Sequence, residues 1–420
     1  MKILLKSCTI IDPQSQHHLQ KRDILIDGQK IEKIDDNIGA FADKTVDITN
    51  LHVSQGWYDA KVNFQDPGLE YKEDITSGIK ASELGGMTAV SVTPNTTPRI
   101  SNKTQIDYVK NKASFSPVDI FPYGTLTEGG EGKNIAEYYD MSQAGAVGFT
   151  DAHEPVSAGI MYRALLYMKN TNSLVVSFPY DYSIFGKGQV NESRASLLTG
   201  LKSIPSISEY LIVERDLSLL AYTEGRLHFS GISTLESVDL IRAAKQKGLA
   251  VTADAYAHHI MFNDESVLDF DSNFKVLPPL RSEKDRLALI KGLKDGTIDF
   301  VCSDHTPEDT EHKDLEFDLA NFGMIGTQTL FSSVNSIDQL SLVEKIACIS
   351  RKPRQIMCIS NPIIEAGQFA NMTLFDPALT YTLASSDLAS LSKNTPLIGK
   401  ELTGKALGII NKGIISIFED

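Results

Sequence analysis

The segment Gly56-Trp-Tyr-Asp-Ala-Lys-Val-Asn-Phe-Gln-Asp-Pro-Gly68 is an apolar-alternating run that ends in a Pro-Gly turn. Alternation is typical of a strand, in which successive side chains point to opposite faces. The turn places the preceding side chains at the end of that strand, where catalytic groups lie in barrels of alternating strands and helices. The segment therefore predicts a barrel strand with candidate functional side chains at alternate positions.

Seven further apolar runs follow this segment, and helix-length stretches separate most of them. Buried parallel strands have this continuous apolar character. Eight such units closing on themselves make a (β/α)8 TIM barrel, which we expect over residues 54–365. An open doubly wound sheet is the alternative, but no Gly-rich nucleotide loop opens any unit. The predicted strands are Trp57–Asn63, Met87–Thr93, Val118–Tyr123, Ala146–Thr150, Leu174–Phe178, Arg226–Ser230, Ala250–Ala255 and Ile298–Ser303.

Two of the intervening helices carry signals for their ends. Ser233 with Glu236 predicts a capping box, and Gly248 closes the helix that begins there. Ser282 with Asp285 predicts a similar start for a helix over residues 283–293.

Both ends of the chain have a β pattern instead. Residues 23–34 contain two alternating runs joined at Asp27-Gly28, a strong hairpin signal, and strand-like runs return over 367–377 and 408–418. We expect residues 1–53 and 366–420 to form one composite, β-sandwich-like domain beside the barrel.

Composition excludes several classes of protein. The formal charge of −14 over 420 residues argues against nucleic acid or an anionic membrane as a partner. No apolar run approaches the roughly 18 residues of a membrane span, and the N-terminus turns polar too soon for a secretory signal. The four cysteines form no CxxC pair, so neither a disulfide framework nor a thiolate zinc site is indicated. We expect a cytoplasmic protein.

An ordered set of motifs runs through nearly the whole chain. It resembles the dihydroorotases, enzymes of pyrimidine biosynthesis in the amidohydrolase superfamily, whose opening strand has Asp59 and 66–68 in the same frame. The resemblance implies a barrel of the metal-dependent hydrolase type and hydrolysis or closure of a cyclic amide. The later motifs are Gly85-Gly-Met-Thr-Ala-Val90, Pro94-Asn-Thr96, Val276-Leu-Pro-Pro-Leu-Arg281, Ser303-Asp-His-Thr-Pro307 and Ser392-Lys-Asn-Thr-Pro396.

The residues that bind zinc in active dihydroorotases are mostly replaced in this chain. The resemblance assigns the four histidine positions to Lys61, Asn63, Phe178 and Gly231, and two carboxylate positions to Asp151 and Asp304. Phe and Gly offer no side-chain lone pair, Asn is a poor zinc ligand, and a protonated Lys repels a cation. We therefore expect no metal cofactor, and we expect Asp304, the match of the catalytic aspartate, to be vestigial.

The substrate positions implied by the resemblance are partly changed. Asn95 is retained and His305 matches a family histidine, but Gln65 replaces an arginine and Leu277 an asparagine. Gln cannot supply the charged bidentate fork with which arginine holds a carboxylate. Glu308 replaces a histidine at the start of residues 308–323, the segment that covers substrate in active relatives.

Lys61 is expected to project toward the metal position and to face Asp151 and Asp304. Its ammonium would compensate carboxylates that otherwise repel one another, so we predict that Lys61 replaces the charge of the metal. A metal site rebuilt from Asp151, His153 and Asp304 is the alternative, and the simpler interpretation of His153 is a hydrogen-bonded structural histidine.

Three functions follow from these observations. The first is a catalytically inactive, dihydroorotase-like protein, because members without metal ligands are known as structural partners of aspartate carbamoyltransferase. The second is an active cyclic-amide hydrolase with a reorganised site, and the third is a small-molecule binding barrel. The sequence leaves a homo-oligomer open.

Overall fold

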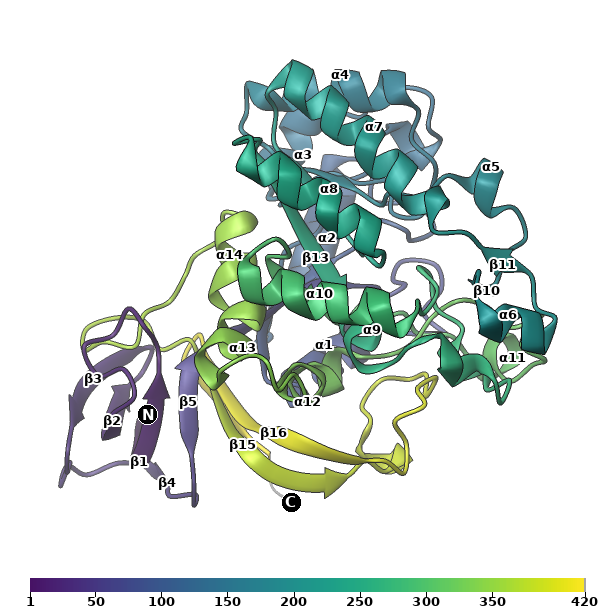
Figure 1. Ribbon diagram of the computed structural model, residues 1–420. Coiled ribbons are helices and arrows are strands. Elements are labelled where there is room, and N and C mark those ends of the chain that lie inside the picture. The colour runs from purple at the N-terminus through teal and green to yellow at the C-terminus, as the bar shows by residue number, and fades with distance from the viewer. Residues whose placement is uncertain (419–420) are drawn as a thin grey trace.

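The computed structural model describes residues 1–418, most of which form a barrel of parallel strands inside a ring of helices (Figure 1). The strands make two sheets, in the orders β6-β7-β8 and β14-β13-β12-β9. Backbone bridges of Phe149 with Gly124 and Val175, and of His305 with Val62, join the sheets into a closed barrel. Its strands are β6 (Trp57–Val62), β7 (Met87–Val92), β8 (Asp119–Ile120), β9 (Val175–Ser177), β12 (Leu227–Phe229), β13 (Val251–Tyr256) and β14 (Phe300–Cys302).

The fourth predicted strand, Ala146–Thr150, is reduced to the bridges of Phe149. The neighbouring glycine explains this, because Gly148 has no side chain to pack on a pleated surface and weakens a strand. Phe149 is fully buried and still occupies the place of the missing strand between β8 and β9. The (β/α)8 architecture is thus present with one rudimentary strand.

The helices cover the outside of the barrel (Figure 1). The predicted capping box of Ser282 and Asp285 is confirmed at the start of α10. The predicted box at Ser233 is wrong, because Ser233 bonds to Glu209 and Thr234 caps α8 instead. The main helices are α1 (Ile75–Leu84), α2 (Lys103–Lys112), α3 (Tyr138–Ala144), α4 (Ala158–Lys169), α7 (Ile207–Thr223), α8 (Leu235–Gln246), α10 (Glu283–Asp295), α12 (Leu330–Asn335), α13 (Leu342–Ile349) and α14 (Arg351–Ile356).

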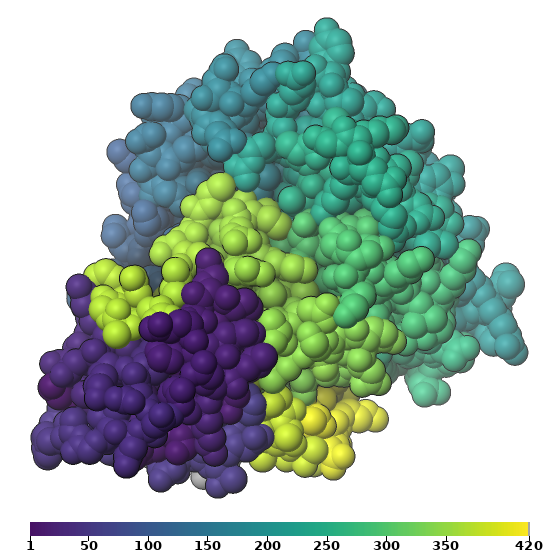
Figure 2. All heavy atoms as spheres, turned by 60° about the vertical axis from the view of Figure 1, so that its left-hand side comes forward, coloured from purple at the N-terminus to yellow at the C-terminus, as the bar shows by residue number. Residues whose placement is uncertain are grey.

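The two ends of the chain meet in one eight-stranded sheet. Its order is β17-β16-β15-β5-β1-β2-β3, with β4 paired to β1, and the predicted hairpin turn has Gly28 at φ +59°. The strands of this sheet share one buried apolar cluster, to which Ile10, Val53 and Leu374 belong, and β5 extends to Gln55. The N-terminal part touches the yellow-green segment that leads into β15 (Figure 2), where the Ser15 hydroxyl donates to the carbonyl of Ile364 at 2.7 Å. The strands are β1 (Lys2–Ile11), β2 (Lys21–Asp27), β3 (Lys30–Asp35), β4 (Lys44–Val46), β5 (His52–Gln55), β15 (Met372–Thr382), β16 (Glu401–Asn411) and β17 (Ile414–Ile417).

The barrel interior is filled, so the site lies above it at the carboxyl ends of the strands. One buried cluster of side chains fills the space enclosed by the barrel strands; it includes Tyr58, Tyr123, Tyr256 and Phe300. No helix within residues 1–418 has the length and apolar character needed to span a bilayer. Short elements surround the mouth: α5 (Tyr182–Phe185), β10 (Val190–Asn191), α6 (Arg194–Thr199), β11 (Ser203–Ile204), α9 (Ala257–Met261) and α11 (Thr310–Lys313).

Candidate functional site

Lys61, near the end of β6, and Asp304, just beyond β14, form a buried ion pair. Lys61 Nζ lies 3.1 Å from Asp304 Oδ1, and the two side chains are 8% and 5% exposed. Asp304 has φ +51°, a left-handed conformation that is uncommon for a non-glycine residue. Such conformations cluster at functional sites, where the surrounding structure fixes them.

Tyr256, at the end of β13, completes the surroundings of the ammonium. Its hydroxyl accepts a hydrogen bond from Lys61 Nζ, which also lies 4.3 Å from the centre of the Tyr256 ring. A Cβ atom added at Gly231 would lie 2.5 Å from the Tyr256 hydroxyl oxygen. Tyr256 therefore fills the space that a side chain at position 231 would need. Sequence reasoning missed this residue because it lies in an apolar strand, and the glycine opposite was the available signal.

The side-chain amide of Asn63 forms hydrogen bonds with other residues of the protein. Its Nδ2 donates to Thr306 Oγ1 at 2.8 Å and to the carbonyl of His305 at 3.3 Å. Its Oδ1 accepts from the Thr93 hydroxyl. These bonds connect β6 to the segment after β14, so Asn63 has a structural role in closing the barrel.

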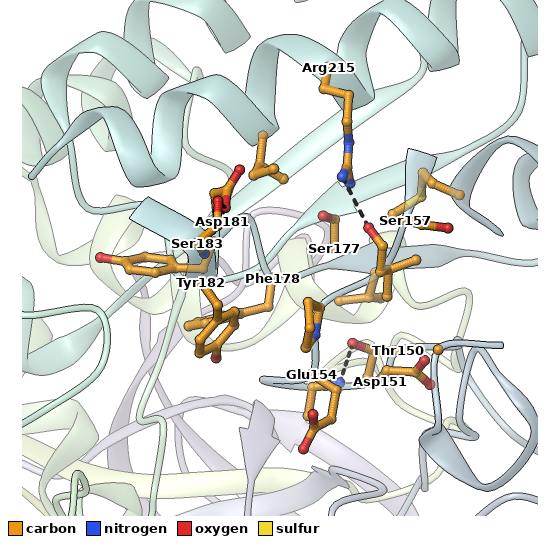
Figure 3. A pocket seen from close by; sticks show the side chains of 18 of the residues that line it. Thr150, Asp151, Glu154, Ser157, Ser177, Phe178, Asp181, Tyr182, Ser183 and Arg215 are labelled. Atoms are coloured by element: carbon orange, nitrogen blue, oxygen red, sulfur yellow. Dashed lines mark hydrogen bonds between the residues drawn. The ribbon is translucent and has the colours of Figure 1, made fainter. Parts of the chain in front are cut away.

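Asp151 is bonded to a loop backbone rather than to Lys61, whereas the Phe178 ring centre lies 5.2 Å from Lys61 Nζ. The Asp151 carboxylate accepts from the backbone N–H of Leu126 at 2.8 Å and of Thr127 at 2.9 Å, and from the Thr127 hydroxyl at 2.5 Å. Together with Phe178 it lines a lateral cavity of about 440 Å³ (Figure 3). Of the two carboxylates that Lys61 was expected to face, Asp304 forms an ion pair with it, and the Asp151 carboxylate accepts hydrogen bonds from loop backbone N–H groups.

Two buried histidines, His228 on β12 and His305 beyond β14, are held by carboxylates. His228 Nε2 lies 2.9 Å from Asp254 Oδ2, and the other oxygen of Asp254 accepts from the Gly231 N–H at 2.7 Å. His305 Nε2 lies 3.4 Å from Glu73 Oε2. Both histidines are buried. Their geometry is that of structural histidines.

A cavity of about 310 Å³ opens beside Asp304 at the barrel mouth. Its charged residues are paired: Lys72 Nζ lies 2.8 Å from Glu308, and Arg99 lies 2.7 Å from Glu154. Six residues singled out from the sequence meet here, whereas His305, Asn63 and Gly231 do not line the cavity; the six are Gln65, Asn95, His153, Leu277, Asp304 and Glu308. Its lining is Gln65, Leu69, Lys72, Asn95, Arg99, His153, Glu154, Leu277, Asp304, Thr306, Glu308, Phe322 and Gly323.

Burial dominates the electrostatics of the mouth. It raises the pKa of Asp304 to about 6, although the Lys61 ammonium opposes the shift. Burial, with a smaller contribution from Lys61 and Arg99, lowers the pKa of His153 to about 3. It likewise lowers the pKa of His258 well below its ordinary value. Near neutral pH these histidines carry no charge that competes with Lys61.

The residues present do not fit a catalytic metal. Within residues 1–418, no three His, Cys, Asp or Glu side chains come together in a way that could hold a metal ion. The alternative site of Asp151, His153 and Asp304 also fails, because Asp151 is occupied by backbone donors. An ammonium that pairs with Asp304 would repel any cation placed beside it.

The barrel with its appended β-sheet is shared with solved structures of hydantoinases and dihydropyrimidinases. The L-hydantoinase (dihydropyrimidinase) from Arthrobacter aurescens superposes with a TM-score of 0.86, over 100% of this chain and 97% of that one, at 21% identity. A dihydropyrimidinase from Brevibacillus agri gives 0.84, over 99% and 95%, at 18% identity. These similarities establish the fold.

Similarity of sequence narrows the class to a family. Residues 52–237 match the family model described as dihydro-orotase-like. The chain is 36% identical to a dihydroorotase of Geotalea daltonii over 98% of both chains, and 37% identical to one of Syntrophotalea carbinolica over 99% of both. The chain belongs to the dihydroorotase family.

Proposed function

We propose that this chain is a non-catalytic member of the dihydroorotase family that acts as a structural or regulatory partner of aspartate carbamoyltransferase. The observation that carries the first part is the replacement of the four histidine positions by Lys61, Asn63, Phe178 and Gly231. Lys61 takes over the charge of the metal, since its ammonium is buried against Asp304.

The chemistry of the mouth supports inactivity. Hydrolysis of a cyclic amide near neutral pH requires a strong nucleophile, which metalloenzymes obtain by lowering the pKa of bound water. The residues here offer no such activation, and the Asp304 carboxylate is held in an ion pair with Lys61. A general base must be free to accept a proton from water, so this pairing disfavours base catalysis.

The relatives named dihydroorotase favour a second function, an active hydrolase of dihydroorotate or a related cyclic ureide. The cavity beside Asp304, with Asn95 and Gln65 in its lining, favours a third, a barrel that binds a small molecule without turnover. The carbamoyltransferase partner comes from the family resemblance, in which members without metal ligands have that role.

Two measurements separate these functions. Metal analysis of the purified protein, with an assay of dihydroorotate and carbamoyl-aspartate interconversion, tests activity. Stoichiometric zinc together with turnover that Asp304→Ala abolishes would overturn the proposal. Co-purification with aspartate carbamoyltransferase tests the partner, and absence of a complex at micromolar concentrations of both proteins would count against it.

A further inference from the structure

The Lys61 ammonium has one carboxylate and one hydroxyl as polar contacts, and the nearby rings of His153 and His258 pack against Phe178 and Tyr256. Its Nζ contacts one carboxylate oxygen of Asp304 and the hydroxyl of Tyr256. Two aromatic rings complete the enclosure: the ammonium lies 4.3 Å from the ring centre of Tyr256 and 5.2 Å from that of Phe178. Aromatic faces attract ammonium ions through the ring quadrupole, whereas they offer no lone pair to a transition metal.

We infer that Asp304, Tyr256 and Phe178 form an ammonium site, which selects a compact alkylammonium over a divalent metal. Lys61 is the natural occupant, tethered through its own backbone. This inference rests on the proposed loss of metal catalysis and goes beyond it, because it assigns the chemical class of cation that the altered mouth accepts.

The charge of the site matches one positive charge. Asp304 supplies a single carboxylate, and burial raises the pKa of the Tyr256 hydroxyl well above its ordinary value, so Tyr256 stays neutral. The neighbouring Asp254 is already bonded to His228 and to the Gly231 N–H. A divalent ion placed here would have only one anionic ligand to offset a large desolvation cost.

Tyr256 supplies both a hydroxyl and an aromatic ring to the ammonium site. Gly231 has no side chain, which leaves the space that the Tyr256 ring fills. With any side chain at 231, the Tyr256 ring would have to leave, because its Cζ and hydroxyl oxygen lie 2.5 Å from the position of a Cβ. Gly231 also has φ +77°, a conformation that side chains other than glycine adopt at a cost. A histidine restored at 231 alone would therefore disrupt the enclosure before it reached a metal.

Chemical rescue tests the inference directly. Lys61→Ala removes the atoms equivalent to n-propylammonium, so that ion is the probe. We expect n-propylammonium to raise the thermal midpoint of Lys61→Ala, and an ion at about ten times its Kd to raise the folded-to-unfolded ratio about tenfold. Tetramethylammonium, which has no N–H to donate, and zinc should give no comparable shift. The double variant Lys61→Ala/Tyr256→Leu should lose the response.

Lys169→Ala is the matched control, because Lys169 pairs with Glu224 on the surface, where its side chain is 46% exposed. If Lys61→Ala does not fold alone, its refolding yield with and without n-propylammonium gives the same readout. No response to the amine, or an equal response in Lys169→Ala, overturns the inference, as does saturable stabilisation of Lys61→Ala by zinc. None of these readouts depends on turnover or on the carbamoyltransferase. A failure of this inference can therefore be distinguished from a failure of the proposed function.

Discussion

Replacing Lys61 by methionine keeps most of the side-chain volume and leaves Asp304 buried without a counter-charge. The two groups lie 3.1 Å apart, and their side chains are buried, with 8% and 5% exposed. Breaking such a pair from one side costs about 3–5 kcal/mol. We expect Lys61→Met to lose that much unfolding free energy at about pH 8, measured by urea denaturation.

The loss should shrink in acid, because a protonated Asp304 needs no counter-charge. Burial already holds the pKa of Asp304 at about 6, and removal of the opposing ammonium moves it higher. A carboxyl whose pKa is raised on folding stabilises the fold at low pH, and that contribution is lost as pH rises through the folded pKa. For each further unit by which the folded-state pKa of Asp304 rises in Lys61→Met, the variant regains about 1.4 kcal/mol more unfolding free energy between about pH 8 and pH 5.

Two control variants are measured alongside Lys61→Met. Lys61→Met/Asp304→Asn removes both charges and should recover most of the stability. Lys169→Met breaks an exposed pair and should cost less than about 1 kcal/mol. A Lys61→Met variant no less stable than Lys169→Met at pH 8, or a loss of stability that does not change with pH, would show that Lys61 does not compensate a buried Asp304 charge.

Three further perturbations follow from the buried polar contacts. Glu308→Gln leaves Lys72 uncompensated at the mouth, so we expect about 3–5 kcal/mol lower stability by urea unfolding, with faster hydrogen exchange over residues 308–323; unchanged exchange would contradict this. Glu73→Gln weakens the charged acceptor shared by His305, the Ser390 hydroxyl and the Leu391 N–H, and should cost about 1–3 kcal/mol in the same assay; a neutral effect would show that the charge of Glu73 is dispensable. His153 has a folded pKa of about 3, so the unfolded chain takes up its proton first and stability falls as pH drops from about 6.5 towards 3. Urea midpoints compared at about pH 7 and pH 4.5 should show a smaller acid loss in His153→Phe, and an identical loss would refute the assignment.

Local signals in the sequence predicted local structure well. The Asp27-Gly28 turn and the Ser282 capping box depend on neighbouring residues, and both are present. The box at Ser233 failed because a distant residue, Glu209, binds the Ser233 hydroxyl and two backbone N–H groups instead. Tertiary contacts of this kind leave no trace in the spacing of residues along the chain.

The same distinction holds at the site. The sequence motif of residues 56–68 correctly predicted that the Lys61 ammonium lies beside Asp304. It could do so because both residues lie at the ends of strands that are neighbours in a closed barrel. Asp151 could not be placed, since its partners are backbone groups of Leu126 and Thr127 in another loop. Tyr256 was hidden in a buried strand, and only the absence of a side chain at Gly231 indicated that a large neighbour fills that space.

The most direct test of the central claim is the metal content of the purified chain after incubation with excess zinc and removal of unbound metal, together with dihydroorotate turnover in the same sample. We expect substoichiometric zinc and no turnover above the buffer rate, in both the natural chain and Asp304→Ala. One zinc ion per chain, with turnover that disappears in Asp304→Ala, would contradict it.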